Sequence, residues 1–425
     1  MMKTYDSYKD SGIEWIGELP RHWEVMKTNH LTYNLDGLRI PLNSEERSDI
    51  QGDIPYWGSN GIVDYVNKYT INEEIILVGE DGSPFFDQFK DVSFYVNQPV
   101  WVNNHIHVLK TKENIYPRFL THSFNCVDYK EYITGSTRDK LTQSDLKRIK
   151  HCVPPLTEQE QIVSYLDEKT SLIDEMVEKK KRKIELLKEY RTSLINTVVT
   201  KGLNPDVPMK DTGIEWIGEI PKHWELKRLK YISEIIPSNV DKHIFEDEIQ
   251  VELCNYTDVY KNDKVDSNTI LSKGSCNTSE YEKYHVKLND VIITKDSESP
   301  DDIGIPCLIS EQLQNVVCGY HLTMLRPTSV DGRYLFRYLL SNFTKSYFFV
   351  SSNGMTRYGL GKSSIEDLFT TLPPISEQEQ IVSYLDEKTS EIDKTIELEK
   401  KKIELLKEYR QSLISNVVTG KIKVV

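Results

Sequence analysis

Two short stretches of the sequence resemble motifs that bind phosphate or metal ions, and each lacks a residue that the chemistry requires. YGLGKSS, residues 358–364, resembles a phosphate-binding loop, whose glycines let backbone N–H groups approach a phosphate. That loop needs a further glycine at position 356, where this chain has Thr356. DVIITK, residues 290–295, resembles part of a metal-dependent nuclease motif, but Thr294 stands where an acid should precede Lys295. The sequence therefore predicts neither an ATP site nor a nuclease centre.

The paired prolines and the histidines also lack the features of catalytic residues. VPPL at residues 153–156 and LPPI at residues 372–375 resemble the proline pair of amino-methyltransferases. Such a site needs an Asn or Asp to bind the amino group and an aromatic side chain to stack on the flipped base, and neither stretch supplies them. The histidines show no HExxH spacing, and His105 and His321 are expected to be hydrogen-bonded strand residues. We therefore expect no catalytic residues, no cofactor and no metal site, and hence a protein that is not an enzyme.

Polar and basic side chains in predicted turns are suited to contact DNA instead. Sequence-specific contacts use Arg, Lys, Asn, Gln, Ser and Thr at base edges and phosphates. In the first half of the chain the candidates are Arg39, Arg47, Tyr56, Ser59, Asn60, Thr137, Arg138 and Lys140. In the second half they are Lys295, Ser297, His321, Thr356, Arg357 and Tyr358. Each of them could equally be an ordinary residue of a polar surface turn.

The Thr-Arg pairs are the strongest of these candidates because they occupy equivalent places in the two halves. GSTRDKL, residues 135–141, aligns with GMTRYGL, residues 354–360. A pair kept between otherwise different segments indicates either a shared phosphate contact or an element of the fold.

Two longer stretches of the sequence occur twice. GIEWIGELPRHWE at residues 12–24 returns as GIEWIGEIPKHWE at residues 213–225. VPPLTEQEQIVSYLDEKTSLIDE at residues 153–175 returns as LPPISEQEQIVSYLDEKTSEIDK at residues 372–394, and both copies lead into KIELLKEYR. A soluble protein rarely keeps copies so similar unless both do the same job, so the sequence predicts two equivalent halves.

The segments between the repeats are largely different from each other. Each contains short β-rich runs separated by turn residues, such as EIILVGEDGSP at residues 74–84 and DVIITKDSESP at residues 290–300. We therefore expect one mixed α+β domain fold used twice, with most surface residues exchanged.

A long helix should follow each domain. After Pro155 no proline or glycine occurs until Gly202. Apolar residues recur nearly every seven positions, which is typical of a coiled-coil seam. The first seam comprises Leu166, Ile173, Lys180, Leu187 and Leu194. About 43 residues at about 1.5 Å each give a helix of about 64 Å. We expect the two helices to form one intramolecular antiparallel coiled coil with pseudo-two-fold symmetry, because parallel pairing would crowd both domains at one end.

Three features of the repeated parts carry further expectations. Thr157, followed by Glu158 and Glu160, is expected to cap the helix start. EKKKRK at residues 178–183 is too charged to be core. The tryptophans of GIEWIGELPRHWE could pin the start of each domain to the helices, or this stretch could bind a partner.

The overall composition bounds the class of protein. The 425 residues exceed one ordinary domain and indicate roughly two to four units. No apolar run is long enough to cross a membrane, and the six cysteines occur singly, so we expect free thiols in a cytoplasmic protein. The net charge of −13 argues against tight DNA binding by the chain alone, although basic patches on one surface remain compatible with it.

In combination, the repeats resemble the specificity subunit of type I restriction–modification systems. The resembling residues are the G-I-x-W-I-G box with its copy, and the PP-x-x-EQ box that opens each long helix. The resemblance covers essentially the whole chain. It implies two target-recognition domains, residues 1–155 and 204–374, alternating with two conserved helices, residues 156–203 and 375–425.

The resemblance also implies a subunit without catalytic activity of its own. Each recognition domain would read one half of a bipartite, asymmetric target in double-stranded DNA, with the half-sites about 10 bp apart. The helices would set the spacer and dock two methyltransferase subunits, motor–nuclease subunits would join them, and no membrane is involved. Two other interpretations remain open: a coiled-coil scaffold that presents two protein-binding domains without DNA recognition, and a nuclease or methyltransferase that acts alone.

Overall fold

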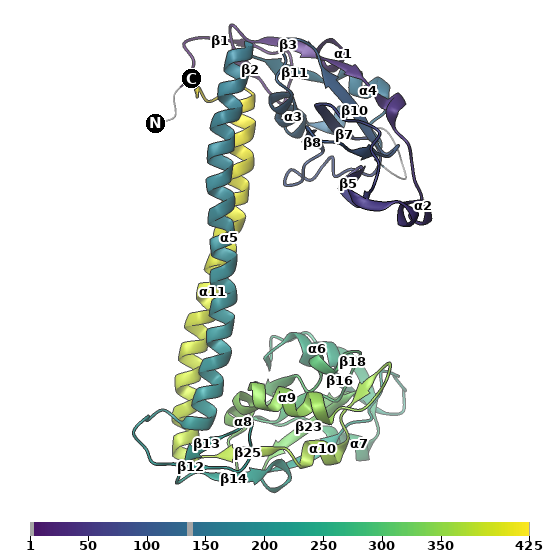
Figure 1. Ribbon diagram of the computed structural model, residues 1–425. Helices are drawn as coiled ribbons and strands as arrows, with labels where there is room; N and C mark the ends of the chain where they lie inside the picture. Colours follow the sequence, from purple (N-terminus) through teal and green to yellow (C-terminus); the bar gives the residue numbers. More distant parts are fainter. Residues whose placement is uncertain (1–3, 134–138, 425) are drawn as a thin grey trace. The chain divides into compact units, whose positions relative to one another are not determined.

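The computed structural model describes residues 4–133 and 139–424 (Figure 1). By its contacts the chain divides into two compact units, of which the first comprises Met1–Lys181 and Glu399–Val425 and the second Arg182–Leu398. Each unit contains one mixed domain and one portion of each long helix. No helix in the described part of the chain is long and apolar enough to cross a membrane.

The domain of the first unit is built on a four-stranded antiparallel sheet. The strand order is β4 (Thr32–Asn34), β10 (Ile106–Thr111), β7 (Ile75–Gly79) and β8 (Ser93–Val96). All five residues of the apolar strand β7 are buried. A second sheet has the order β6 (Gly61–Val66), β5 (Gln51–Gly58) and β9 (Trp101–Val102). The remaining elements are β1 (Tyr8–Asp10), β2 (Glu18–Pro20), β3 (Glu24–Lys27), α1 (Thr28–Leu31), η1 (Asp36–Leu38), α2 (Ser44–Asp49), α3 (Pro117–Asn125), η2 (Tyr129–Glu131), α4 (Gln143–Arg148) and β11 (Lys150–Val153).

The domain of the second unit is built on a corresponding sheet with one more strand. The order is β15 (Ser233–Pro237), β23 (Leu322–Pro327), β19 (Val291–Thr294), β21 (Pro306–Ile309) and β17 (Lys264–Val265). A second sheet has the order β18 (Ser272–Cys276), β16 (Ile249–Cys254) and β22 (Val316–Cys318). The remaining strands are β12 (Met209–Asp211), β13 (Glu219–Pro221), β14 (Glu225–Arg228), β20 (Asp296–Ser297), β24 (Tyr358–Gly359) and β25 (Phe369–Leu372). The helices are η3 (Leu229–Tyr231), α6 (Tyr256–Lys261), α7 (Thr278–Tyr284), η4 (Pro300–Asp302), α8 (Gly332–Leu339), α9 (Asn342–Ser351) and α10 (Lys362–Glu366).

The two core sheets share their strand order and register. Gly79 at the end of β7 lies opposite Ile106, and Thr294 at the end of β19 lies opposite Leu322, in both cases across an antiparallel pair. The structure thus confirms the prediction of one mixed α/β fold used twice.

The two long helices are α5 (Leu156–Lys201) and α11 (Ile375–Val418). They are continuous over 46 and 44 residues, as the lack of Pro and Gly predicts. The N–H groups of Glu158 and Gln159 already donate to the Pro155 carbonyl, at 2.9 and 3.0 Å. Thr157 therefore lies in the first helical turn, and the prediction that it caps the helix is wrong.

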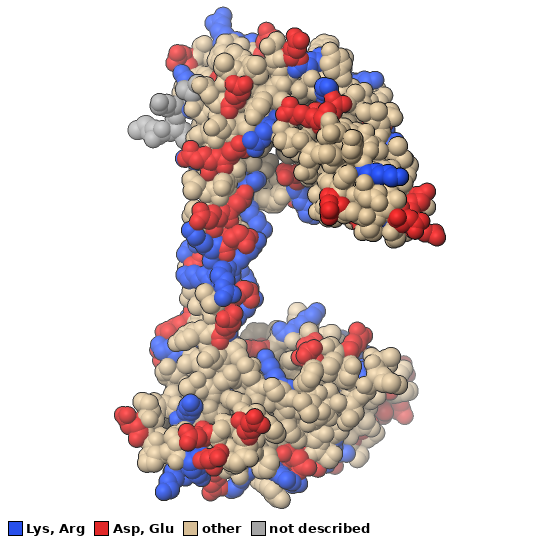
Figure 2. All heavy atoms as spheres, in the orientation of Figure 1, with Lys and Arg blue, Asp and Glu red and all other residues tan. Residues whose placement is uncertain are grey.

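Within each unit the portions of α5 and α11 pack against each other in antiparallel order. In the first unit Asp174 of α5 pairs with Arg410 of α11 at 3.0 Å, and Lys180 pairs with Glu399 at 2.8 Å. The apolar seam residues are buried on the facing sides, namely Leu166, Ile173, Val177, Ile184, Leu385, Ile392, Ile396 and Ile403. The exposed sides carry basic and acidic side chains intermixed (Figure 2). One member of the charged stretch 178–183 nonetheless enters the seam, since Lys180 faces the buried Glu399.

The repeated tryptophan box packs against the start of a long helix in each unit. Trp23 and Trp224 are fully buried. The histidines before them bind the first-turn glutamates, with His22 Nε2 2.9 Å from Glu158 and the same distance in the second unit between His223 and Glu377. This supports the packing interpretation of the box.

The repeated EQ box holds the domain to its helix through a glutamine. The Gln159 side chain accepts a hydrogen bond from the Tyr116 N–H at 2.8 Å and donates to the Pro154 carbonyl at 2.8 Å. Gln378 accepts from the Asp331 N–H at 2.8 Å and donates to the Pro373 carbonyl at 2.8 Å. Each joint is therefore the same set of bonds, made once per unit.

A buried histidine lies next to the first of these joints. His151 on β11 has Nδ1 2.8 Å from the Ser123 hydroxyl and Nε2 3.0 Å from the Thr28 hydroxyl. Burial lowers the pKa of His151 to about 3, and burial likewise lowers the pKa of His122 to about 4. Both rings are therefore neutral in the folded protein at neutral pH.

Mild acid should destabilise the protein through these histidines. Their folded-state pKa values lie below the ordinary 6.5, so below that pH the unfolded chain binds more protons than the folded protein. The contribution of these histidines to the free energy of unfolding is therefore fully present above pH 6.5 and is lost as the pH drops toward 3. One such group changes the free energy of unfolding by about 1.4 kcal/mol per pH unit in this range. We expect His151→Gln to flatten this dependence in urea unfolding at pH 7, 6 and 5, whereas the exposed-site control His30→Gln should keep the wild-type slope. If the free energy of unfolding of His151→Gln kept the wild-type pH dependence, this dependence could not be attributed to His151.

Candidate nucleic-acid interface

Each domain has a polar turn at the end of its central strand, and backbone bonds fix this turn in the same way in both domains. In the first domain the Glu80 N–H donates to the His105 carbonyl at 3.0 Å. In the second the Lys295 N–H donates to the His321 carbonyl at 3.0 Å. Glu80 and Lys295 thus occupy equivalent positions and carry opposite charges.

The segment that follows each Thr-Arg pair crosses the same turn. The Leu141 N–H donates to the Glu80 carbonyl, and the Leu360 N–H donates to the Lys295 carbonyl, both at 2.8 Å. In the second domain this crossing is the two-stranded ribbon of β20 and β24. The predicted equivalence is therefore supported for the residues that follow the Thr-Arg pairs, Leu141 and Leu360.

An aspartate–histidine pair lies beside the turn in both domains. His105 Nδ1 is 3.3 Å from a carboxylate oxygen of Asp81, and His321 Nδ1 is 2.6 Å from one of Asp296. Both histidine side chains remain partly exposed. A carboxylate bound at Nδ1 orients the ring and leaves Nε2 available to a group outside the protein.

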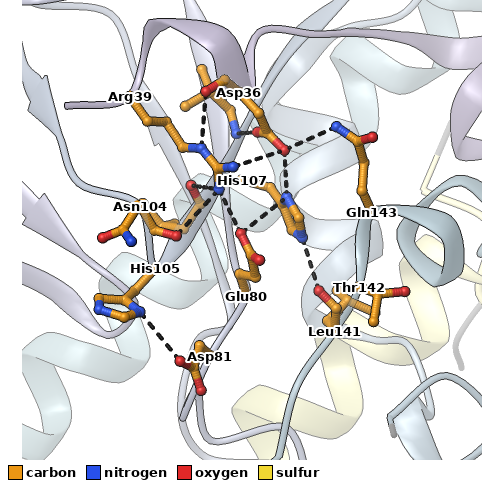
Figure 3. Close-up of polar contacts among 12 residues, drawn as sticks. Asp36, Arg39, Glu80, Asp81, Asn104, His105, His107, Leu141, Thr142 and Gln143 are labelled. Atoms are coloured by element: carbon orange, nitrogen blue, oxygen red, sulfur yellow. Dashed lines mark hydrogen bonds and ion pairs between the residues drawn. The ribbon is translucent and has the colours of Figure 1, made fainter. Parts of the chain in front are cut away.

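Glu80 gathers two basic side chains in the first domain. Arg39 Nη1 binds the Glu80 carboxylate (Figure 3). Lys140 Nζ lies 3.4 Å from the other oxygen of this carboxylate. The Arg39 Nε–H also donates to the Asp36 carbonyl at 3.0 Å. The structure thus brings together Arg39 and Lys140, which are about 100 positions apart in the sequence.

Asp36 and Glu80 form a buried network with His107, and Arg39 supplies its positive charge. His107 Nδ1 is 2.8 Å from Asp36, and Nε2 is 2.9 Å from the Leu141 carbonyl (Figure 3). Ligand atoms of Asp36, Glu80 and His107 lie within 4.8 Å of one another, as a metal site would need. The Arg39 guanidinium already contacts both carboxylates, so a metal ion there would meet a fixed positive charge. Burial acts to raise the pKa of Asp36, but the hydrogen bond and charge of His107, together with hydrogen bonds from the Val108 backbone and the Asn34 side chain, outweigh it and lower this pKa to about 2.

Arg47 and Tyr56 form a separate group in the first domain. Tyr56 is only 1% exposed, and its hydroxyl accepts the Leu42 N–H at 3.0 Å. The Arg47 guanidinium lies 5.2 Å from the centre of the Tyr56 ring, and its Nε donates to Asp64 at 2.9 Å. The structure places Tyr56 in the core beneath Arg47, contrary to the surface contact expected from the sequence, because its ring and hydroxyl are both used in packing.

Ser59 and Asn60 lie beside the turn that follows Glu80. The Ser83 hydroxyl donates to the Ser59 carbonyl at 2.9 Å, and the Asn60 side chain donates to the Gly82 carbonyl at 3.3 Å. Asn60 is exposed and Ser59 is partly exposed. Both residues therefore lie at the same turn as Arg39 and Lys140. Their contact with DNA stays a prediction. Thr137 and Arg138 lie outside the described residues.

Lys295, His321 and Arg357 converge in the second domain. Arg357 Nη2 is 3.3 and 3.4 Å from the two ring nitrogens of His321, and such similar distances place it over the face of the ring. Lys295 Nζ donates to the Ser238 carbonyl at 2.9 Å and lies 5.2 Å from the centre of the Tyr320 ring. Two basic groups and two flat rings thus share one surface.

The other predicted residues of the second domain differ in accessibility. Tyr358 pairs with Ser297 across the β20–β24 ribbon and is partly exposed. Ser297 is buried, and its hydroxyl accepts the Ser299 N–H at 3.2 Å, so its side chain is turned inward. Thr356 is exposed.

Sequence reasoning did not single out the aspartates, His105 or Tyr320. His105 and His321 were expected to be strand residues, and His321 was also a candidate for DNA contact. β10 begins at Ile106 and β23 at Leu322, so both histidines precede their strands. A signal was available, because an acid follows each central strand and a histidine precedes each neighbouring one. Only the pairing of these strands brings the two side chains together.

The two domains are equivalent, and each has a polar turn of different composition. The sequence profile of the family described as the type I restriction modification DNA specificity domain matches residues 20–186 and again residues 221–408. The chain belongs to this family and carries two copies of its domain.

Named relatives resemble the chain over different lengths. A candidate type I restriction enzyme specificity subunit of Haemophilus influenzae is 38% identical over 33% of this chain and 36% of that protein. The type I restriction enzyme MjaVIII specificity subunit of Methanocaldococcus jannaschii is 22% identical over 98% of this chain and 97% of that protein.

Solved structures share the fold. The HsdS subunit from Thermoanaerobacter tengcongensis matches with a TM-score of 0.54 and 16% identity, covering 95% of this chain and 98% of that one. A chain from a structure on complex assembly and conformational transition of the type I R-M system matches with a TM-score of 0.68 and 15% identity, covering 94% and 98%.

Proposed function

We propose that this chain is the DNA-specificity subunit of a type I restriction–modification enzyme. Residues 1–155 and 204–374 each read one half of a bipartite, asymmetric target in double-stranded DNA. Residues 156–203 and 375–425 set the spacer and dock the partner subunits. The observation that carries the proposal is the pair of equivalent turns, which have the same backbone bonds but opposite charges at Glu80 and Lys295.

The division between shared and different side chains matches the two kinds of DNA contact. Phosphates are the same at every base pair, so the side chains that contact them can be the same in both domains. Base edges depend on the sequence, so two different half-sites require different side chains. We assign the shared histidines His105 and His321 to phosphates. Glu80 holds Arg39 and Lys140, whereas the equivalent residue Lys295 is itself basic, so the two turns would present different donors to base edges. The two turns therefore specify different bases.

In the proposed assembly this chain has no catalytic role of its own. Two methyltransferase subunits bind the repeated helices and carry out methyl transfer, and motor–nuclease subunits join them for cleavage. The net charge of −13 is compatible with this arrangement, because the affinity for DNA comes from the whole assembly.

A map of methylated bases in the source genome, with and without this gene, tests the proposal. Loss of one split, asymmetric methylated motif on deletion, and its return on complementation, is the expected result. An unchanged map in a strain that transcribes the whole system would overturn it and favour a coiled-coil scaffold that presents two protein-binding domains.

His321→Ala should weaken binding at one half-site without changing its base preference. Losing a hydrogen bond to a charged phosphate should reduce the affinity of the assembled methyltransferase for DNA about tenfold to a hundredfold. Competition binding with oligonucleotides altered in one half-site measures both the loss of affinity and the base preference.

The matched variant for this prediction is His105→Ala. It should give the same loss at the other half-site only. If either variant relaxed the base preference, or if both affected the same half-site, the assignment of these histidines to phosphates would be wrong.

A further inference from the structure

The long helices make one inter-helix ion pair twice. Asp174 of α5 pairs with Arg410 of α11 at 3.0 Å in the first unit, and Arg191 of α5 pairs with Asp393 of α11 at 3.1 Å in the second. The sequence repeat relates residue 174 to residue 393 and residue 191 to residue 410. The two ion pairs are therefore equivalent, with the helices exchanged.

The two residues of the Lys180–Glu399 pair are equivalent to each other in this repeat. Lys180 Nζ is 2.8 Å from a Glu399 carboxylate oxygen. The same repeat that relates residue 174 to residue 393 relates residue 180 to residue 399. Two strictly identical helices would place identical residues face to face here, yet this chain has a lysine on α5 and a glutamate on α11.

The seam around this pair does not distinguish one helix from the other. Val177 corresponds to Ile396 and Ile184 corresponds to Ile403, and all four are buried. Similar apolar residues would also let α5 pack against α5 of a second copy of the chain. The charges at 180 and 399 are different, and the Glu399 side chain is only 4% exposed, so a mismatch there is poorly screened by water.

We propose that the Lys180–Glu399 pair makes α5 choose α11 and reject α5 of a second copy. In an α5–α5 pairing two Lys180 side chains would meet, and the neighbouring Lys183 of each helix would add to the positive charge. In an α11–α11 pairing two buried Glu399 carboxylates would meet, each of them 3.3 Å from Lys402 of its own helix. Like charges that face each other in a seam oppose that pairing.

The selection of helix partners bears on the kind of target. An α5–α5 dimer would join two identical first domains and would favour a symmetric site. Pairing α5 with α11 joins one domain of each kind, so it favours an asymmetric site. The helix selection itself is independent of DNA, whereas this consequence rests on the proposed function.

Two reporter cysteines can detect the rejected pairing directly. In an α5–α5 pair residue 174 of one copy would face residue 191 of the other, because residue 191 is the equivalent of residue 410. The variant Asp174→Cys/Arg191→Cys would then form a disulfide between chains. Within one helix the two positions lie about 25 Å apart, too far for a disulfide, and inside one chain each faces α11 instead.

Two double variants in this reporter background isolate the charges. Lys180→Leu/Glu399→Leu should fold at least as stably, since well-packed apolar residues often replace a buried ion pair without loss. It should also give at least a tenfold larger yield of cross-linked dimer on non-reducing gels after refolding at high concentration. The charge-exchanged control Lys180→Glu/Glu399→Lys should stay uncrosslinked, like the wild-type reporter. Equal yields from the two double variants would overturn the proposal.

A mixing experiment tests the same idea without a new apolar surface. Lys180→Glu carries glutamate at both positions, and Glu399→Lys carries lysine at both. Refolded together, these chains can form α5–α5 pairs with opposite charges, so the cross-linked heterodimer should form in the mixture and in neither variant alone. Its absence from the mixture would count against the proposal, and no outcome depends on DNA binding.

Discussion

Replacing both Leu186 and Leu405 with aspartate should abolish methylation of the target in cells. These residues are equivalent in the repeat, and both are about half exposed on the long helices. Tyr190 and Tyr409 lie four residues further along the same helices, are equivalent too, and are equally exposed. An exposed leucine and tyrosine at this spacing form one apolar stripe on each helix. A stripe that occurs twice suits two copies of one partner, and the proposed function identifies that partner as the methyltransferase subunit.

The number of bound methyltransferase subunits is the measurement that checks this prediction. A buried carboxylate at the centre of an apolar contact would cost most of the binding energy. Native mass spectrometry of the purified complex should therefore show two subunits on the wild type, one on Leu186→Asp or Leu405→Asp, and none on the double variant. Circular dichroism should show unchanged helix content.

Met176→Thr is the matched control for these variants. Met176 is as exposed as Leu186, but its repeat equivalent is Thr395, so this apolar residue occurs on one helix only. The substitution should leave both subunits bound. Loss of a subunit from this control, or loss of both subunits from either single variant, would show that the docking stripe has been placed wrongly.

The repeated parts of the fold could be predicted closely because the sequence states them twice. The seven-residue spacing of Leu166 and Ile173 requires a partner stripe, and the second copy supplies one, so the antiparallel helix pair was accessible from the sequence alone. The details that failed depend on single atoms. Thr157 lies within the helix because the Pro155 carbonyl accepts the first helical bonds. Lys180 occupies the seam position that the seven-residue spacing predicts, although its charged stretch was not expected to be core, because Glu399 is there to neutralise it.

The candidate DNA-binding residues could be predicted only in part. Residue type and predicted turns selected Arg39, Lys140 and Arg357, and the structure places each beside the expected kind of turn. Neither feature reveals that Tyr56 is buried beneath Arg47, where its hydroxyl accepts the Leu42 N–H. The aspartate–histidine pairs were missed for a related reason, since each joins the end of one strand to the residue before another.

Lengthening both long helices should lengthen the spacer of the DNA target and leave its half-sites unchanged. The seam repeats every seven residues, so duplicating residues 177–183 in α5 and 396–402 in α11 preserves the packing on both sides. Each added heptad extends a helix by about 10.5 Å, which corresponds to about 3 bp of DNA. In the proposed function the half-sites are read by side chains of the two domains, which this change does not touch.

The helical phase of DNA makes this prediction sharper. One added heptad changes the spacer by about a third of a DNA turn, so the second half-site faces a different direction and methylation should be weak. Three added heptads correspond to about 9 bp, close to one turn of 10–10.5 bp, so methylation should recover at a spacer about 9 bp longer. Mapping methylated bases for both variants distinguishes the helices as a spacer from any role in reading bases. A changed half-site, or an unchanged spacer in the three-heptad variant, would mean that something other than the helix pair sets the distance.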